Sequence, residues 1–175
     1  MSADPLPAHM AQQRPFPDLT GRTVLQVIPE LNAGGAERTV IEVAEAIISA
    51  NAKALVASAG GRLVPDLEAL GAEHIAMNAT SKNPFILRAN RNRLASLIRE
   101  RGVDIIHARS RAPAWSAYWA AQLTGAVFVT TYHGAYSAKT GLKRRYNSVM
   151  AKGARVIANS AWTAAHVKAE HGVDG

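Results

Sequence analysis

The chain has 175 residues, a hydrophobic fraction of 48% and no cysteine. This length suits one domain with a substantial core, and the composition is that of a globular chain, not of a disordered one. The lack of cysteine excludes disulfides, thiolate metal sites and cysteine nucleophiles, and it fits a cytoplasmic protein. No apolar run approaches the roughly 18 residues of a membrane span, and the N-terminus lacks the apolar core of a signal peptide.

The net charge of +7 is concentrated in two stretches of the chain. Residues 82–111 hold eight basic and two acidic residues, and residues 139–155 hold six basic residues and no acidic one. One explanation is an anionic partner, such as a membrane surface, a nucleic acid or a phosphorylated substrate. The other is two ordinary solvated helix faces in a basic protein, and the sequence leaves both open.

The first 20 residues contain four of the eight prolines and show no hydrophobic periodicity. We expect residues 1–20 to form a flexible tail, and residues 21–175 to form the folded domain.

Short strands rich in β-branched residues alternate with helices along that domain. We expect strands at residues 24–28, 54–57, 74–77, 104–108, 127–132 and 155–158. Helices are expected from residue 35 onward, at 64–70, from 83 to 102, at 114–123, in the basic segment up to 152, and at 161–170 behind a Ser160 cap. This alternation predicts an α/β fold with a doubly wound, Rossmann-like parallel sheet.

Polar residues follow three of the expected strands. Gly34 and Gly35 come after the first, residues 107–111 lie at and after the fourth, and His133 and Gly134 follow the fifth. In parallel sheets the ligand lies beyond the carboxyl ends of the strands, near the point where strand order reverses. We therefore expect these three strand ends to converge on one site.

The stretch VLQVIPELNAGGAE, residues 24–37, has the arrangement of strand, glycine-rich turn and helix that binds anions. It lacks G-x-G-x-x-G and no Gly-Lys-Ser/Thr follows, which disfavours the usual NAD and ATP sites. Adjacent glycines allow close approach of a ligand and a positive φ at the turn. The alternative is a tight connection without a ligand.

His133 could donate a hydrogen bond to a sugar or phosphate, or shuttle a proton, whereas a structural role is the alternative. His107 lies inside its strand and is expected to be packed. Arg109 and Arg111 flank Ser110 just beyond the fourth strand, where guanidinium groups could hold an anionic acceptor. Ordinary solvation in a loop is the alternative for both arginines.

Three aromatic residues, Trp115, Tyr118 and Trp119, share one helix face, for which core packing is the first interpretation and an acceptor or lipid contact the second. The six histidines are scattered, and no metal-binding spacing or G-x-S-x-G elbow occurs. We expect no metal site.

Four stretches together resemble a known family. They are VLQVIPELNAGGAERTVIEVAEAI, DIIHARSRAPAW, VFVTTYHG and RVIANSAWTAAHV, in this order and at the expected strand ends. From about residue 23 onward the chain resembles the N-terminal domain of retaining GT-B glycosyltransferases, the group that includes bacterial lipopolysaccharide and capsule glycosyltransferases with a GGAE loop.

The resemblance implies roles for several residues. Gly34, Gly35 and Glu37 would lie against the donor diphosphate or the reacting acceptor, and His133 would approach the donor sugar as the catalytic residue. Further positions implied are Arg109, Ser110 and Arg111 for the acceptor, Gly134 and Ser160 in the cleft, and the basic residues Arg88, Arg91, Arg93, Lys143, Arg144 and Arg145 for docking on an anionic membrane.

The resemblance also implies an activity. It is sugar transfer from a nucleotide-sugar donor to a glycan or lipid-linked acceptor in cell-envelope polysaccharide synthesis, with retention and without a metal or other cofactor. The leaving diphosphate would help deprotonate the acceptor, and its electrostatic stabilisation would be the main task of the protein. The location implied is the cytoplasm, with peripheral contact to the inner face of the cytoplasmic membrane.

In this family a second, C-terminal domain holds most of the donor, and the chain ends before it. We therefore expect the chain to be the acceptor-binding half, inactive by itself. The alternative is a non-catalytic Rossmann-like module whose basic helices bind an anionic membrane or nucleic acid. Nucleic acid is the weaker partner, because no recognition motif is present.

Overall fold

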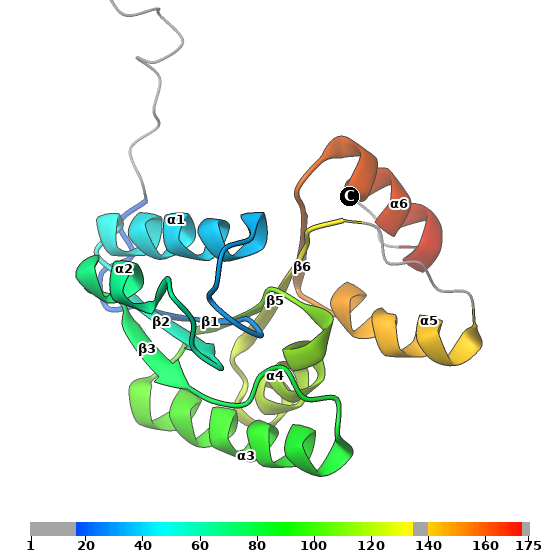
Figure 1. The fold of residues 1–175 in the computed structure, drawn as a ribbon, viewed down its shortest axis with the longest axis horizontal. Coiled ribbons are helices and arrows are strands. Elements are labelled where there is room, and N and C mark those ends of the chain that lie inside the picture. Colours follow the sequence, from blue (N-terminus) through cyan, green and yellow to red (C-terminus); the bar gives the residue numbers. More distant parts are fainter. Residues whose placement is uncertain (1–16, 135–139, 173–175) are drawn as a thin grey trace, which may run out of the picture.

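A single parallel sheet organises the structure (Figure 1). The computed structural model describes residues 17–134 and 140–172. The sheet has the order β3-β2-β1-β4-β5-β6, and every neighbouring pair is parallel. Its strands are β1 (Thr23–Val27), β2 (Lys53–Ser58), β3 (Glu73–Ala76), β4 (Ile105–Ala108), β5 (Val127–Tyr132) and β6 (Arg155–Ala158). Each lies within one residue of the range expected from the sequence, so the predicted α/β fold class is confirmed.

Helices cover both faces of the sheet. One face carries α1 (Gly35–Ser49) and α2 (Val64–Ala69), whose apolar side chains pack on β1 and β2. The other face carries α3 (Pro84–Arg101) and α4 (Arg111–Thr124). The 3-10 helix η2 (Ser148–Ala151) and α6 (Ala161–His171) contribute apolar side chains to the same face. Two separate apolar cores result, as expected for a doubly wound sheet.

Local chemistry fixes the ends of the longest helix, α3. The Asn83 side chain accepts a hydrogen bond from the Phe85 amide at 2.9 Å, and Pro84 occupies the first helical position. At the other end Gly102 adopts the left-handed conformation, φ 61° and ψ 45°, that terminates many helices. The Ser160 cap expected for α6 is also present, because its hydroxyl accepts from the Thr163 amide at 3.1 Å.

Two helices depart from the predicted boundaries. Helix α4 begins at Arg111 and not at residue 114, so Arg111 belongs to its first turn and not to a loop. The run APAW contains a proline early in the helix, where the missing N–H costs nothing. The basic segment is divided into α5 (Gly141–Asn147) and η2.

Of the expected flexible tail, residues 1–20, the first 16 lie outside the described residues. Residues 17–20 are described, and they belong to the folded domain. The Leu19 amide donates to the Ala50 carbonyl at 2.7 Å, and Leu19 packs against the α1 side of the sheet. The Asp18 carboxylate accepts from Thr20 and from Asn51. The domain therefore starts a few residues before position 21.

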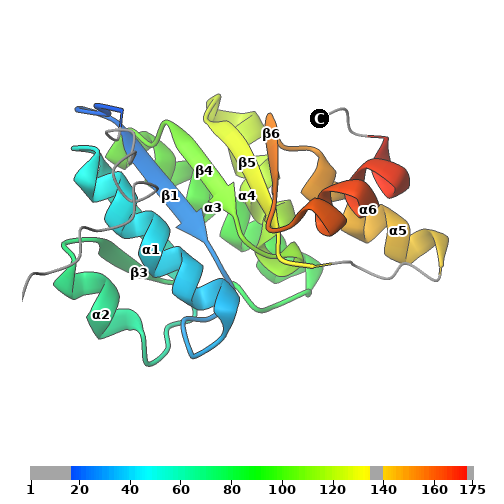
Figure 2. The same ribbon diagram turned by 90° about the horizontal axis from the view of Figure 1, so that it is seen from above.

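Strand order reverses between β1 and β4 (Figure 2). From β1 the chain first builds the sheet outward to β2 and β3, and then crosses back to add β4, β5 and β6 on the other side. The connections after β1 and after β4 leave on opposite faces, which opens a crevice at their carboxyl ends.

The middle of the sheet on the α1 side is polar. Gln26 on β1 lies beside His107 on β4, and the His107 Nε2 lies 2.7 Å from the Thr131 hydroxyl on β5. All three side chains are buried. Burial, reinforced by the Arg109 charge and by His133, lowers the pKa of His107 to about 3. His107 is therefore a neutral, packed residue, as its position inside the strand predicted.

The turn after β2 supports the loop after β1. Gly60 and Gly61 have positive φ angles of 94° and 144°. The Leu31 amide donates to the Gly60 carbonyl at 2.8 Å, and the Leu63 amide donates to the Leu31 carbonyl at 2.9 Å. A Cβ atom at Gly61 would lie 2.3 Å from the Leu31 oxygen, so only glycine fits there.

The depressed pKa of His107 predicts a pH-dependent stability. Between its ordinary pKa and the lowered one, the unfolded chain binds a proton that the folded chain does not, so stability falls as the pH falls. We expect the free energy of unfolding of the wild type, measured with urea, to fall relative to that of His107→Gln as the pH is lowered. Below about pH 6 the relative loss should be on the order of 1 kcal/mol per pH unit. Parallel pH profiles for the two proteins would contradict this.

Gly61→Ala should destabilise the protein by about 2 kcal/mol or more, through positive-φ strain and the clash with Leu31. Gly35→Ala is the matched control, because an added Cβ there meets no atom within 4 Å. It should leave the free energy of unfolding within about 0.5 kcal/mol of wild type. Equal costs for the two substitutions, measured by chemical denaturation, would refute this account of the turn.

Candidate functional site

The expected convergence of strand ends forms a pocket. Its volume is about 290 Å³, and it lies at the carboxyl ends of β1, β4 and β5 beside the start of α1. Its lining residues are Ile28, Pro29, Glu30, Ala36, Glu37, Thr80, Arg109, Ser110 and His133. We call it the strand-end pocket. Four of the candidate residues predicted from sequence line it, namely Glu37, Arg109, Ser110 and His133.

Arg109 is a buried cation, not a solvated loop residue. Its exposed fraction is 4%, and it follows β4 on the face that α1 covers. Its Nη2 donates to the Thr39 hydroxyl, which in turn donates to the Ala36 carbonyl at 2.8 Å. Burial lowers the pKa of Arg109 to about 10, partly offset by Glu42, so the guanidinium is charged near neutral pH. Its Nε has no hydrogen-bond partner within the described chain.

His133 directly follows β5 and is half-buried. Its carbonyl accepts from the Asn159 side chain at 3.0 Å, which fixes the backbone at this strand end. Burial lowers the pKa of His133, and the Arg109 charge lowers it further, whereas Glu37 opposes the shift. The imidazole is therefore neutral at neutral pH. Its Nε2 is buried and lacks a partner among residues 17–134 and 140–172.

The glycine loop approaches the pocket without lining it. Gly34 is extended, φ −101° and ψ 172°, and precedes α1. Neither Gly34 nor Gly35 has a positive φ, so this turn does not use the positive φ that adjacent glycines allow. The Glu37 carboxylate lies over Gly34, where an added Cβ would be 2.2 Å from its Oε2. Gly35 is open to solvent. Glycine therefore serves close approach here, not an unusual backbone angle.

A second and larger hollow shares Ser110 with the strand-end pocket. Its volume is about 780 Å³, and we call it the basic groove. It is lined by Lys82, Ser110, Arg111, Ala112, Thr140, Leu142, Lys143 and Tyr146. Arg111 thus faces a different hollow from Arg109, although the two flank one serine. The two basic stretches of the sequence meet here, since Lys82 comes from one and Lys143 from the other.

Two other predicted residues lie outside both hollows. Ser160 caps α6, and its hydroxyl is 2.9 Å from the Thr163 hydroxyl. Gly134 follows His133 with open space around it, and the segment after it lies outside the described residues.

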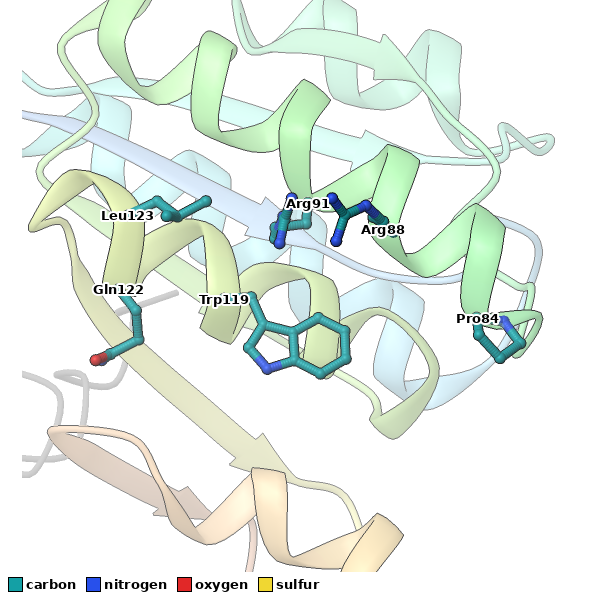
Figure 3. A pocket seen from close by; sticks show the side chains of 6 residues that line it. All are labelled: Pro84, Arg88, Arg91, Trp119, Gln122 and Leu123. Atoms are coloured by element: carbon teal, nitrogen blue, oxygen red, sulfur yellow. The ribbon is translucent and has the colours of Figure 1, made fainter.

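A third pocket lies between α3 and α4, away from the strand ends (Figure 3). Its volume is about 390 Å³, and Arg88 and Arg91 on α3 lie across it from Trp119 on α4. Leu123 is at the same surface. We call it the helix-face pocket. Trp119 is 37% exposed, so the core interpretation holds for its two helix neighbours but not fully for Trp119.

The other two aromatic residues of α4 are packed. The Trp115 indole donates to the Tyr146 carbonyl at 3.1 Å, and Tyr118 packs on Phe128 with 5.5 Å between the ring centroids. The remaining basic residues expected to dock on membranes, Arg93, Arg144 and Arg145, are exposed on α3 and α5.

Several contributors were missed by sequence reasoning. Thr39 holds Arg109, and Thr80 and Glu30 enter the strand-end pocket from two loops. Lys82 and Tyr146 line the basic groove. Glu30 and Thr39 lie within the first stretch of the family resemblance, which assigned them no role. Thr80, Lys82 and Tyr146 belong to no recognisable motif.

Within residues 17–134 and 140–172, no group of three or more His, Cys, Asp or Glu side chains could hold a metal ion. In the same part of the chain, no helix is both long enough and apolar enough to cross a membrane.

Solved structures that match this chain are about twice its length, and several of them are glycosyltransferases. The glycosyltransferase of Rickettsia africae ESF-5 is 43% identical, with a TM-score of 0.77, and the match covers 87% of this chain and 40% of that one. HepE of Anabaena, solved with UDP and glucose, is 19% identical, with a TM-score of 0.66 and coverages of 84% and 40%.

The lipopolysaccharide outer core galactosyltransferase WaaB is 13% identical, with a TM-score of 0.61 and coverages of 87% and 43%. The two distant likenesses show the fold, which is the N-terminal half of a GT-B glycosyltransferase. The chain spans about 40% of the length of these structures.

A search among curated protein sequences gave no match. The sequence profile of Glycosyltransferase Family 4, in contrast, matches residues 33–175, which include the glycine loop, α1, the ends of β4 and β5, and both basic stretches. The chain therefore belongs to Glycosyltransferase Family 4.

Proposed function

We propose that the chain is the acceptor-binding half of a retaining glycosyltransferase that uses a nucleotide-sugar donor and no metal. The observation that carries this proposal is Arg109, a buried cation that lines the strand-end pocket and keeps an unpartnered Nε. A buried charge without an ion pair is costly, and an anionic ligand such as a donor diphosphate would compensate it.

In this proposal the transferred sugar occupies the strand-end pocket. Glu30 and Glu37 line the pocket and can accept hydrogen bonds from sugar hydroxyls, and the neutral His133 can donate one. The diphosphate lies at the open rim, beside Gly34 and Gly35, where its developing charge meets Arg109. A bond forms between the acceptor oxygen and the anomeric carbon, the bond to the diphosphate breaks, and the acceptor proton passes to the leaving diphosphate.

The donor nucleotide would be held mainly by a second domain, outside this chain. HepE, whose structure contains UDP and glucose, has more than twice the length that matches here. We propose that the chain alone does not transfer sugar, because it supplies one wall of a two-domain cleft. A cell-envelope acceptor is part of the proposal, supported by the fold shared with WaaB.

The basic helices support a second role, contact with an anionic membrane. The helix-face pocket combines two guanidinium groups with Trp119 and Leu123, which is 51% exposed, and no acidic residue lines it. Cations beside exposed apolar side chains suit the headgroup region of a bilayer. Nucleic acid would explain the charge but not the apolar residues. The location we propose is the cytoplasm, at the inner membrane face.

A hybrid protein tests the catalytic proposal. In it this chain replaces the matched part of the Rickettsia africae glycosyltransferase, and release of nucleoside diphosphate is followed over a panel of nucleotide sugars. The hybrid should turn over, and His133→Ala should lower kcat about 100-fold, as expected for loss of one positioned donor. His166→Ala on α6, a histidine remote from the strand ends, is the control and should leave the rate unchanged. The 175-residue chain alone should be inactive.

A normal rate for the His133→Ala hybrid would refute the site. Sugar transfer by the isolated chain would refute its assignment as a half-enzyme.

Vesicle co-sedimentation tests the membrane proposal. The chain should bind vesicles that contain phosphatidylglycerol and not vesicles of phosphatidylcholine alone. Combined Arg88→Ala, Arg91→Ala and Arg93→Ala should weaken binding about tenfold or more, because each cation near an anionic surface contributes about 1 kcal/mol.

The control removes the same charge elsewhere, through Arg38→Ala, Lys53→Ala and Lys168→Ala, which lie on α1, β2 and α6. The α3 variant should lose markedly more binding than this control. Unchanged vesicle binding by the α3 variant, or tighter binding to random duplex DNA than to vesicles, would overturn the membrane role.

A further inference from the structure

The basic groove is electrostatically unlike the strand-end pocket beside it. Three of its eight lining residues are cationic, Lys82, Arg111 and Lys143, and none is acidic. The strand-end pocket contains two carboxylates, from Glu30 and Glu37, against the single charge of Arg109. The groove therefore favours an anion of two or more charges more strongly than the interior of the pocket does.

One wall of the groove is held by hydrogen bonds. The Arg111 Nη1 donates to the Asn147 side chain at 3.0 Å, and the Tyr146 hydroxyl donates to the Arg111 carbonyl at 3.4 Å. The Tyr146 carbonyl accepts from the Trp115 indole. Burial raises the pKa of Tyr146 although Arg111 opposes the shift, so its hydroxyl remains a donor. These contacts tie α4 to α5 and hold Arg111 in place at the wall of the groove.

The groove adjoins the pocket where the reaction is proposed. Ser110 lines both, so a molecule lying in the groove can extend past this residue toward His133. Leu142, also on the lining, is 82% exposed and offers an apolar contact. The cations, the apolar side chain and the reaction site are thus arranged along one path.

We propose that the basic groove binds a phosphate or diphosphate ester carried by the acceptor, while the acceptor's reacting hydroxyl enters the strand-end pocket. This inference rests on the proposed function and specifies its acceptor class as phosphorylated. It also gives the two basic stretches of the sequence a shared role, because each contributes a lysine to the groove. The helix-face pocket is a separate feature and is not needed for it.

The test measures binding of inorganic diphosphate to the 175-residue chain by titration calorimetry. Paired Lys82→Ala and Lys143→Ala should weaken binding about tenfold, the scale of one to two charge-assisted hydrogen bonds. Both lysines are exposed, so the fold should tolerate the change. Arg99→Ala with Arg155→Ala is the matched control, since it removes one exposed cation from each basic stretch outside the groove. The control should change affinity less than twofold.

A second arm distinguishes a lipid-linked from a soluble phosphorylated acceptor. A short prenyl diphosphate is compared with inorganic diphosphate, with and without Leu142→Ala. Tighter binding of the prenyl ester that Leu142→Ala abolishes supports a lipid-linked acceptor. Equal binding of both probes supports a soluble one.

No detectable binding of either probe, or equal losses in the lysine pair and the control pair, would overturn the inference. Its failure is separable from failure of the proposed function. If the lysine pair binds diphosphate normally while His133→Ala still stops the hybrid enzyme, the groove assignment is wrong and the catalytic site stands. The opposite pattern would retain the groove and reject the catalytic site.

Discussion

The burial of the Arg109 guanidinium constrains this end of the molecule more than any other contact. A charge that is 4% exposed needs hydrogen bonds, and here Thr39 supplies one from the first turns of α1. The bond joins the end of β4 to the helix that follows β1, across the point where strand order reverses. The position of the glycine loop, at the start of that helix, is therefore fixed relative to the strand ends.

The same charge also acts on the pKa of its histidine neighbours. Arg109 contributes to lowering the pKa of both His107 and His133, after burial as the main cause. Near neutral pH the centre of the site is thus one permanent cation with two neutral imidazoles. The His107 Nε2 is hydrogen-bonded to the Thr131 hydroxyl within the sheet, whereas the His133 Nε2 has no partner in the described chain. Only one of the two histidines has an atom to offer a ligand.

Much of this could be predicted from the sequence, because parallel sheets impose it. Hydrophobic periodicity and turn residues located every strand to within one residue. The alternation of strands and helices placed three strand ends at the carboxyl edge of the sheet. Burial at that edge could not be predicted. Arg109 was assigned to the acceptor with solvation as the alternative, and the structure instead shows a buried residue held by α1. Arg109 and Arg111 face different hollows because α4 begins at Arg111. The sequence placed the start of this helix three residues too late.

Charge patterning along the chain is also insufficient to predict where charges meet. The two basic stretches are separated in sequence by the aromatic helix and by β5, and solvated helix faces were an equal explanation for them. Folding brings one lysine of each to the groove that Ser110 and Arg111 also line. Arg109 is buried, whereas Arg93, Arg144 and Arg145 remain exposed on helices. The basic residues of the chain thus divide into a small group that borders the candidate site and a larger group that lies away from it, so net charge alone does not locate a site.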